Sequence, residues 1–228
     1  MLERKRIIIK SSKGGQEMKI NAPKITQNLI ERNFTDILYE EDPEFEMSLI
    51  KDAAFTNETL ERVRLYNTVI KNCDFMNTDF SRIDLTDVRF ENCNLSNTIL
   101  SSASMHRVEF YNCKLLGSNL TESYIGNVKF ADSILNMAMF GESKLEKVIF
   151  DDVSLESADL YDCKLKKVEF LSCNINDVSF DETSLNGIDI SSSEFESLIV
   201  SIENLKGCKV SSFQAIQFAA LLGLEIKD

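Results

Sequence analysis

An apolar side chain stands at every residue number divisible by five from Phe45 to Val210, thirty-four positions in a row. The chain is only 43% hydrophobic, so an unbroken run of this length marks a repeat rather than chance. A helix needs apolar residues three and four apart and a strand needs them two apart, and a period of five fits neither. We therefore expect the chain to turn a corner every five residues.

The residue two before each apolar position is small or β-branched, as at Ala53, Thr68 and Cys73. Two inward side chains separated by one outward residue are typical of a short extended segment. The remaining positions are polar and rich in Asn, Asp, Ser and Thr, which favour turns through local hydrogen bonds. The pattern predicts short extended sides joined by polar corners.

A longer period of twenty residues shows how many sides make one coil. The same pair returns as Val88 with Phe90, Val108 with Phe110, Val128 with Phe130, Val148 with Phe150 and Val168 with Phe170. Four five-residue sides therefore form a coil. Coils stacked at about 4.8 Å, the spacing of hydrogen-bonded strands, would give a rod of about eight coils and roughly 40 Å. Phe90, Phe110 and Phe130 should then form a single interior stack.

Several five-residue segments resemble the A(D/N)LXX unit of the pentapeptide repeat family. They include Ala158-Asp159-Leu160-Tyr161-Asp162, Thr78-Asp79-Phe80-Ser81-Arg82 and Ser118-Asn119-Leu120-Thr121-Glu122. The resemblance covers nearly three quarters of the chain. It implies an all-β fold, a right-handed quadrilateral β-helix, which we assign to residues 47–210.

Residues 1–17 are unlike the rest, with five basic and two acidic side chains. They contain no apolar run of the length that a signal peptide or a membrane span needs. Lys13-Gly14-Gly15 can be encoded by a purine-rich, ribosome-recruiting sequence just upstream of Met18. We predict that translation naturally begins at Met18 and that residues 1–17 are a disordered, non-native leader; a native N-terminus at Met1 would contradict this. Without the leader, the formal charge changes from −12 to −15.

Both ends of a solenoid need cover for their open backbone groups and apolar interior. Residues 18–46 lack the five-residue frame, so we interpret them as an N-terminal cap with a short strand near Ile25 and a helical turn near Ile30. Residues 211–228 begin with the helix N-cap signal Ser211-Ser212 and have a stop signal at Gly223. They predict a short C-terminal helix, and Leu224-Glu225-Ile226 a possible short strand.

The C-terminal segment has two interpretations. It is either a simple cap or a dimer interface that joins two rods end to end, as in several proteins that this chain resembles. The segment carries more apolar surface than one end of a narrow rod needs, which favours the homodimer. Its interface residues would be Phe213, Phe218, Leu221, Leu222 and Leu224.

Residues that could perform chemistry are few. All six cysteines occupy inward positions two before an apolar residue, which predicts reduced core thiols and fits a cytoplasmic protein. The C-x-x-C pairs and additional histidines of a zinc site are missing. His106, the one histidine, is predicted to be a solvated surface residue. Without phosphate-binding or hydrolase motifs, we expect no enzyme activity, no metal and no cofactor.

The acidic residues are more informative. Glu122, Glu142, Asp162 and Glu182 are twenty apart and should form one vertical column, with Asp159 and Asp181 on the same side, while Asp132, Asp151, Asp152 and Glu169 lie on another. One interpretation is an ordinary solvated surface, offset by lysines on the adjoining side. These are Lys144, Lys147, Lys164, Lys166 and Lys167. The other is that the acidic rows imitate the phosphates of duplex DNA.

Two functional hypotheses follow. An acidic chain is a poor direct binder of nucleic acid, and we expect no membrane partner. The resemblance extends to quinolone-resistance and toxin-immunity proteins, in the repeat, the acidity and the ending from Gln214 to Ile226. It implies a bacterial, cytoplasmic DNA mimic that binds DNA gyrase or topoisomerase IV. The unbroken frame departs from those relatives that project loops between coils. The alternative is a structural scaffold that binds another protein without imitating DNA.

Overall fold

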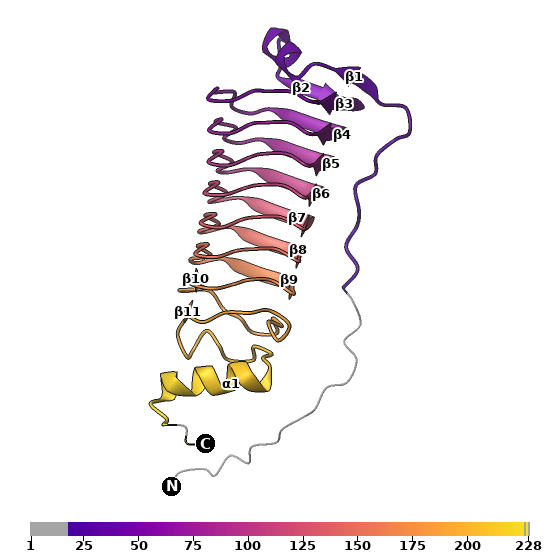
Figure 1. Ribbon diagram of the computed structural model, residues 1–228. Coiled ribbons are helices and arrows are strands. Elements are labelled where there is room, and N and C mark those ends of the chain that lie inside the picture. Colours follow the sequence, from indigo (N-terminus) through magenta and orange to yellow (C-terminus); the bar gives the residue numbers. More distant parts are fainter. Residues whose placement is uncertain (1–17, 226, 228) are drawn as a thin grey trace.

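The computed structural model describes residues 18–225 and 227, and most of its regular elements are short parallel strands. The strands are β1 (Ile30–Arg32), β2 (Glu44–Glu46), β3 (Ser48–Lys51), β4 (Arg64–Lys71), β5 (Asp84–Glu91), β6 (Ser104–Tyr111), β7 (Tyr124–Ala131), β8 (Lys144–Asp151), β9 (Lys164–Leu171), β10 (Val178–Ser179) and β11 (Leu198–Ile199). The long sheet runs β1-β3-β4-β5-β6-β7-β8-β9, with β2 also paired to β4, and β10 pairs with β11. Figure 1 shows these strands stacked as a ladder along a rod.

Successive strands pair with a shift of twenty residues, so that Val88 lies beside Val108 and Phe110 beside Phe130. The other two sides of each coil are joined by isolated parallel bridges, such as Asp74 with Asn94 and Asp79 with Ile99. The result is an all-β solenoid of about eight turns. The predicted right-handed quadrilateral β-helix with a short C-terminal helix is confirmed.

The chain turns each corner at a residue with left-handed backbone conformation, two positions after the inward apolar residue. Asn, Asp and Gly reach this conformation most easily, which explains the polar corners of the repeat. These residues form four vertical rows, one for each corner of the coil. The strap corner consists of Asn67, Asp87, Arg107, Asn127, Lys147 and Lys167, and the ladder corner consists of Asp52, Asn72, Asn92, Asn112, Asp132 and Asp152. The third corner consists of Asn57, Asn77, Asn97, Gly117, Met137 and Ser157, and the acidic corner consists of Arg62, Arg82, Ser102, Glu122, Glu142, Asp162 and Glu182.

Corner side chains in neighbouring coils contact one another directly. In the ladder corner, the amide of Asn92 donates to Asn72 at 3.1 Å and that of Asn112 donates to Asn92 at 2.8 Å. An amide can donate to one neighbour and accept from the other, so a row of asparagines is self-complementary. Equivalent corner side chains of successive coils are therefore one coil apart and close enough to interact.

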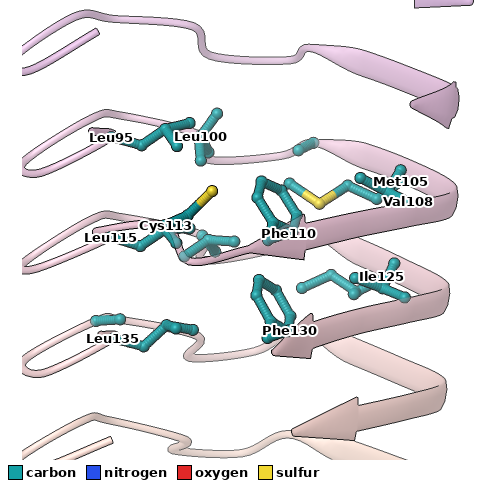
Figure 2. Close-up of a cluster of buried hydrophobic side chains, with 14 of the residues drawn as sticks. Leu95, Leu100, Met105, Val108, Phe110, Cys113, Leu115, Ile125, Phe130 and Leu135 are labelled. Atoms are coloured by element: carbon teal, nitrogen blue, oxygen red, sulfur yellow. The ribbon is translucent and has the colours of Figure 1, made fainter. Parts of the chain in front are cut away.

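The interior of the rod is a stack of aromatic and aliphatic side chains. The rings of Phe90, Phe110 and Phe130 are parallel within 7°, with centroids 4.8 and 4.9 Å apart. Phe150 and Phe170 continue the stack. Figure 2 shows Phe110 and Phe130 one above the other, with Leu115 and Leu135 stacked in the same way. The predicted single interior stack is confirmed.

The N-terminal end is closed by a 3-10 helix, η1 (Phe34–Tyr39), which starts where Asn33 Oδ1 accepts the N–H of Thr35. The ring of Phe34 enters the core, 5.0 Å from Phe55 and 4.9 Å from Phe75. The expected strand near Ile25 and helical turn near Ile30 were misplaced, because β1 begins at Ile30 and the Asn33 N-cap sets the helical turn after it.

Residues 18–29 do not belong to the cap region at all. They form no helix or strand and run along the outside of the rod toward β9, as Figure 1 shows. The prediction that they belong to the cap was wrong, because a missing five-residue frame does not distinguish a cap from a segment lying outside the rod. The predicted leader of residues 1–17 lies outside the described residues.

The C-terminal helix α1 (Ser212–Ala219) continues into the 3-10 helix η2 (Ala220–Leu222). Ser211 and Gln214 form a capping box, and Gln214 Nε2 also donates to the carbonyls of Ile190 and Ser193 at 2.9 and 2.8 Å. Gly223, with a φ of 69°, ends the helical segment as predicted. Leu224 and Glu225 are not in a strand, and Ile226 lies outside the described residues, so the possible strand there does not form over its described part.

Candidate functional site

The acidic corner carries four consecutive carboxylates in its C-terminal half. Glu122, Glu142, Asp162 and Glu182 are exposed and stand one above the other, each in the coil after the last. Among the described residues, none of these four forms an ion pair. The N-terminal half of the same corner carries Arg62 and Arg82 instead, and Arg82 pairs with Glu61. The charge of this corner therefore reverses along the rod.

Asp159 and Asp181 lie on the side of the coil that leads into the acidic corner. Asp159 is half-buried and its Oδ1 accepts the N–H of Tyr161 at 3.0 Å, whereas Asp181 is exposed. The structure thus brings six of the predicted carboxylates to one edge of the rod.

The second predicted acidic group is divided. Asp132 and Asp152 are exposed in the ladder corner, below the stacked asparagines. Asp151 instead pairs with Lys129 at 2.8 Å, and Glu169 accepts the N–H of Met18 at 3.2 Å. Two of these four carboxylates are therefore engaged by other parts of the protein.

Two of the five lysines expected to offset the acidic column pair with a carboxylate outside it. Lys166 and Lys144 lie 2.6 and 3.7 Å from Glu146, which is on the same strand as Lys144. The hydrogen bond from Lys166 lowers the pKa of Glu146, and the same bond raises the pKa of Lys166. In the described part of the chain, no lysine ion pair reaches the acidic corner. The expected partial offset of the column by lysines on the adjoining side therefore stays a prediction.

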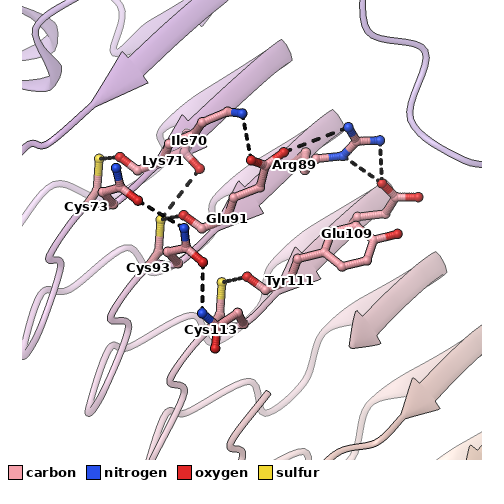
Figure 3. A network of polar contacts seen from close by, with 12 residues as sticks. Ile70, Lys71, Cys73, Arg89, Glu91, Cys93, Glu109, Tyr111 and Cys113 are labelled. Atoms are coloured by element: carbon pink, nitrogen blue, oxygen red, sulfur yellow. Dashed lines mark hydrogen bonds and ion pairs between the residues drawn. The ribbon is translucent and has the colours of Figure 1, made fainter. Parts of the chain in front are cut away.

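A contrasting arrangement covers the outer face of β4–β6. Lys71 pairs with Glu91 at 2.7 Å and Arg89 pairs with Glu109 at 2.8 Å, so opposite charges alternate from coil to coil. Figure 3 shows these pairs side by side. The face is close to neutral, unlike the acidic corner.

The cysteines face inward as predicted, and all six are free thiols. Figure 3 shows Cys73, Cys93 and Cys113 in one column, with hydrogen bonds to backbone carbonyls. Burial raises the pKa of Cys163 to about 12 and of Cys173 to about 11, which keeps these thiols protonated at neutral pH. Cys208 is only half-buried, so the prediction of six core thiols is wrong for this residue.

His106 points outward from β6, but it is half-buried rather than fully solvated. Burial lowers its pKa, and the positive charge of Arg107 lowers it further. The positive charge of Lys24, in the segment outside the rod, also lowers the pKa of His106. The described residues contain no group of three or more potential metal-ligating side chains.

An exposed apolar patch surrounds the third corner in the middle of the rod, and sequence analysis did not identify it. Its members occupy outward positions: Ile99, Leu116, Ile134, Met137, Met139 and Tyr161. Met137 is the most exposed at 61%. The signal was available, because the frame predicts polar residues at these positions.

The predicted dimer residues form a second exposed apolar surface. Phe213, Leu222 and Leu224 are 70, 63 and 58% exposed, and Leu221 is 45% exposed. Phe218 differs, because it is half-buried with its ring 5.4 Å from that of Phe195. Four of the five predicted residues therefore face away from the rod. No helix in the described part of the chain is long and apolar enough to cross a membrane.

The stacked coils define the class of protein: a four-sided parallel β-solenoid with charged corners. Two family models match it, the pentapeptide repeat region over residues 103–180 and the pentapeptide repeats in eight copies over residues 83–121. These matches lie within the coils and confirm, over residues 83–180, the pentapeptide repeat that the sequence predicted. No curated protein sequence matches the chain.

Solved structures share the repeat at low identity. Full-length QnrB1, a plasmid-mediated fluoroquinolone resistance protein, is 19% identical, covers 79% of this chain and 90% of its own, and gives a TM-score of 0.47. HetL from the cyanobacterium Nostoc sp., involved in heterocyst differentiation regulation, is 13% identical over 72% of this chain and 88% of its own, with a TM-score of 0.23. A protein of the Arabidopsis thaliana thylakoid lumen is 21% identical over 40% of this chain and 63% of its own, with a TM-score of 0.38.

Proposed function

We propose that this protein is a non-enzymatic DNA mimic, whose acidic edge occupies the DNA-binding surface of a type II topoisomerase such as DNA gyrase or topoisomerase IV. The supporting observation is the row Glu122, Glu142, Asp162 and Glu182, which is exposed and has no ion pairs within the described residues. One carboxylate per coil of about 4.8 Å is of the same order as one phosphate per about 3.4 Å along a DNA strand.

A basic surface that binds DNA would attract this row for the same electrostatic reason. Aligned charges of one sign steer an oppositely charged partner and fix its register more than they add affinity. QnrB1 is described as a fluoroquinolone resistance protein, which agrees with this proposal without supplying its support. Because the five-residue frame leaves no room for projecting loops, we place modulation of the enzyme ahead of protection from drugs or toxins.

The proposal includes a homodimer formed through the C-terminal helices. The exposed apolar side chains of Phe213, Leu221, Leu222 and Leu224 support it, since a two-fold contact would bury the same surface of both copies. Two rods joined end to end would present two acidic edges to a two-fold symmetric enzyme. The reduced, buried thiols fit a cytoplasmic site of action.

A supercoiling assay with purified gyrase, with and without a quinolone, tests the proposal. The full chain should change supercoiling at micromolar concentration, and the quadruple variant Glu122→Gln, Glu142→Gln, Asp162→Asn and Glu182→Gln should lose most of the effect. The matched control neutralises four exposed carboxylates at the other end: Asp36→Asn, Glu40→Gln, Glu41→Gln and Glu58→Gln. Equal loss in both variants would reduce the effect to net charge, and no effect of the unaltered protein would eliminate the proposal.

A protein-binding scaffold is the second candidate, and the apolar patch at the third corner favours it. Exposed apolar side chains gathered around one corner are typical of protein contact sites. A scaffold of this kind would lose its partner on Met137→Ser and Met139→Ser. It would keep its partner when the four carboxylates of the acidic corner are neutralised. A DNA mimic would respond in the opposite way.

A further inference from the structure

Residues 18–29, which we call the strap, lie along the strap corner of the rod. Their backbone N–H groups donate to side chains of four coils: Thr26 to Asn67 at 2.9 Å, Lys24 to Asp87 at 2.8 Å, Asn21 to Asn127 at 3.1 Å and Met18 to Glu169 at 3.2 Å. These partners are 41 to 151 residues apart in sequence. The strap is thus an extended peptide bound in place by the side chains of the repeat.

The spacing of the strap matches the spacing of the coils. Asn21 and Lys24 are three positions apart in sequence, and their acceptors Asn127 and Asp87 are two coils apart. An extended chain covers roughly 10 Å in three residues, and two coils also measure roughly 10 Å. Any extended segment could therefore place successive N–H groups on this corner in the same register.

Side chains of the strap alternate in their exposure. Ile20, Pro23 and Ile25 are half-buried, whereas Lys19, Lys24 and Thr26 are exposed. On the rod, Val69 and Ile149 occupy outward positions of β4 and β8, yet they are only 7 and 8% exposed. Since the strap passes from the coil of Asn127 to that of Glu169, it crosses the coil of Ile149 between them. Three apolar side chains of the strap are thus partly removed from water, while its N–H groups make hydrogen bonds.

One acceptor of the strap, Asp87, is held in position by another side chain of the rod. Both carboxylate oxygens of Asp87 accept from Arg107, at 2.6 and 2.7 Å, and Oδ1 also accepts the N–H of Lys24. Asp87 and Arg107 are neighbours in the strap corner and therefore stay paired whether or not the strap is present. The acceptor is pre-organised, which lowers the cost of binding a peptide.

We propose that the strap corner of β4–β9 is a binding track for an extended peptide, occupied in this structure by the strap in cis. The ligand is a segment of a partner protein that alternates apolar and polar residues and directs N–H groups to Asn67, Asp87 and Asn127. The strap makes no β-ladder with the rod, so these few contacts can be exchanged for equivalent ones from a partner. This site lies on a different corner from the acidic row and does not depend on the DNA-mimic proposal.

Peptide exchange tests the track. A specific protease site is inserted between Gln27 and Asn28, both exposed, and the full-length protein is cut after folding. The probe is a fluorescent synthetic peptide of residues 18–29, followed by anisotropy. The cut protein should bind the probe saturably, and the uncut protein should bind at least about tenfold more weakly, because a tethered competitor has an effective concentration in the millimolar range.

Corner variants give the matched control. Asn127→Gly should weaken probe binding by about fivefold or more through loss of its hydrogen bond. Asn112→Gly, at a left-handed position of the ladder corner that also makes one side-chain hydrogen bond, should leave it unchanged. A folded, cut protein that releases its fragment and binds no probe at 100-fold the protein concentration would overturn the proposal. Equal binding of a scrambled peptide would also overturn it.

Discussion

The middle of the rod and its C-terminal end carry the same five-residue frame but bury it to different degrees. Phe130 and Phe150 are fully buried, while Phe195, Val200 and Val210 occupy equivalent positions and remain half-buried. A middle coil has a neighbour on each side, whereas the last coils have a neighbour on one side only. The comparison shows that the repeat defines which side chains turn inward, and that neighbouring coils determine how well they are buried.

The helix α1 covers the end only in part. Gln214 bonds to the carbonyls of the last coils and Phe218 packs on Phe195, but the outer face of the helix stays apolar and exposed. The strap adds a further difference, because its anchors extend from the coil of Asn67 to that of Glu169 and stop before the last coils. The strap therefore makes hydrogen bonds to the middle coils of the rod but not to the last coils.

The largest expected effect contrasts two phenylalanines of the frame. Phe130→Ala should lower the free energy of unfolding by about 3–5 kcal/mol, because it leaves a cavity within a continuous stack. Phe195→Ala should cost less than half of that, since its side chain is only half-buried. Urea unfolding followed by circular dichroism measures both free energies. Equal losses would show that the middle of the rod and its C-terminal end are packed equally well.

The next effect concerns the exposed face of α1. Phe213→Ser together with Leu222→Ser should convert the proposed dimer to a monomer while leaving the unfolding transition of the coils unchanged. Light scattering coupled to size-exclusion chromatography gives the mass. Ile99→Ser and Met139→Ser, also at exposed apolar sites, serve as controls that should keep the dimer. A protein that is monomeric at every concentration before mutation would refute the interface.

A smaller, pH-dependent effect should appear along the strap. Burial alone would raise the pKa of Asp87, but the hydrogen bonds from Arg107 and from the N–H of Lys24 together lower it below its usual value. A carboxylate with a lowered folded pKa stabilises the protein above its unfolded pKa of about 3.9, and this contribution is lost as the pH falls through the folded value.

Strap amides should therefore lose protection from hydrogen exchange in acid before core amides do. The measurement compares Lys24 with Phe130 after correction for intrinsic exchange rates. In Asp87→Asn, which removes the titrating group, the protection of Lys24 should no longer depend on pH in this range. If the wild-type strap kept its protection throughout, Asp87 would not be holding it.

The smallest effect separates one thiol from the other five. Burial raises the pKa of Cys208 to about 11, but its side chain is half-buried, so it should be the first to react with a disulfide reagent in the folded protein. The buried thiols should react only after unfolding. Cys208→Ser should abolish the native reaction, and rapid labelling of Cys113 would mean that the middle opens as readily as the end.

The strap and the apolar patch mark the limits of sequence reasoning about the candidate site. The acidic row was predictable because residues twenty apart must stack once the coil is known. The patch at Met137 and Met139 was visible as an exception to the outward polar rule. The strap was not predictable, because Lys24 and Asp87 share no periodic pattern and lie 63 residues apart.

The amino-acid sequence by itself determined the inward positions, the twenty-residue register and the start of the C-terminal helix at Ser211, since each follows from a local or periodic pattern. Only the tertiary structure decided that residues 18–29 lie along the rod, that Lys166 pairs with Glu146 instead of the acidic corner, and that the last coils are half-buried. The physical reason is that these features depend on which surfaces meet across different coils. A repeat that makes every coil alike carries no information about what covers its outside or its ends.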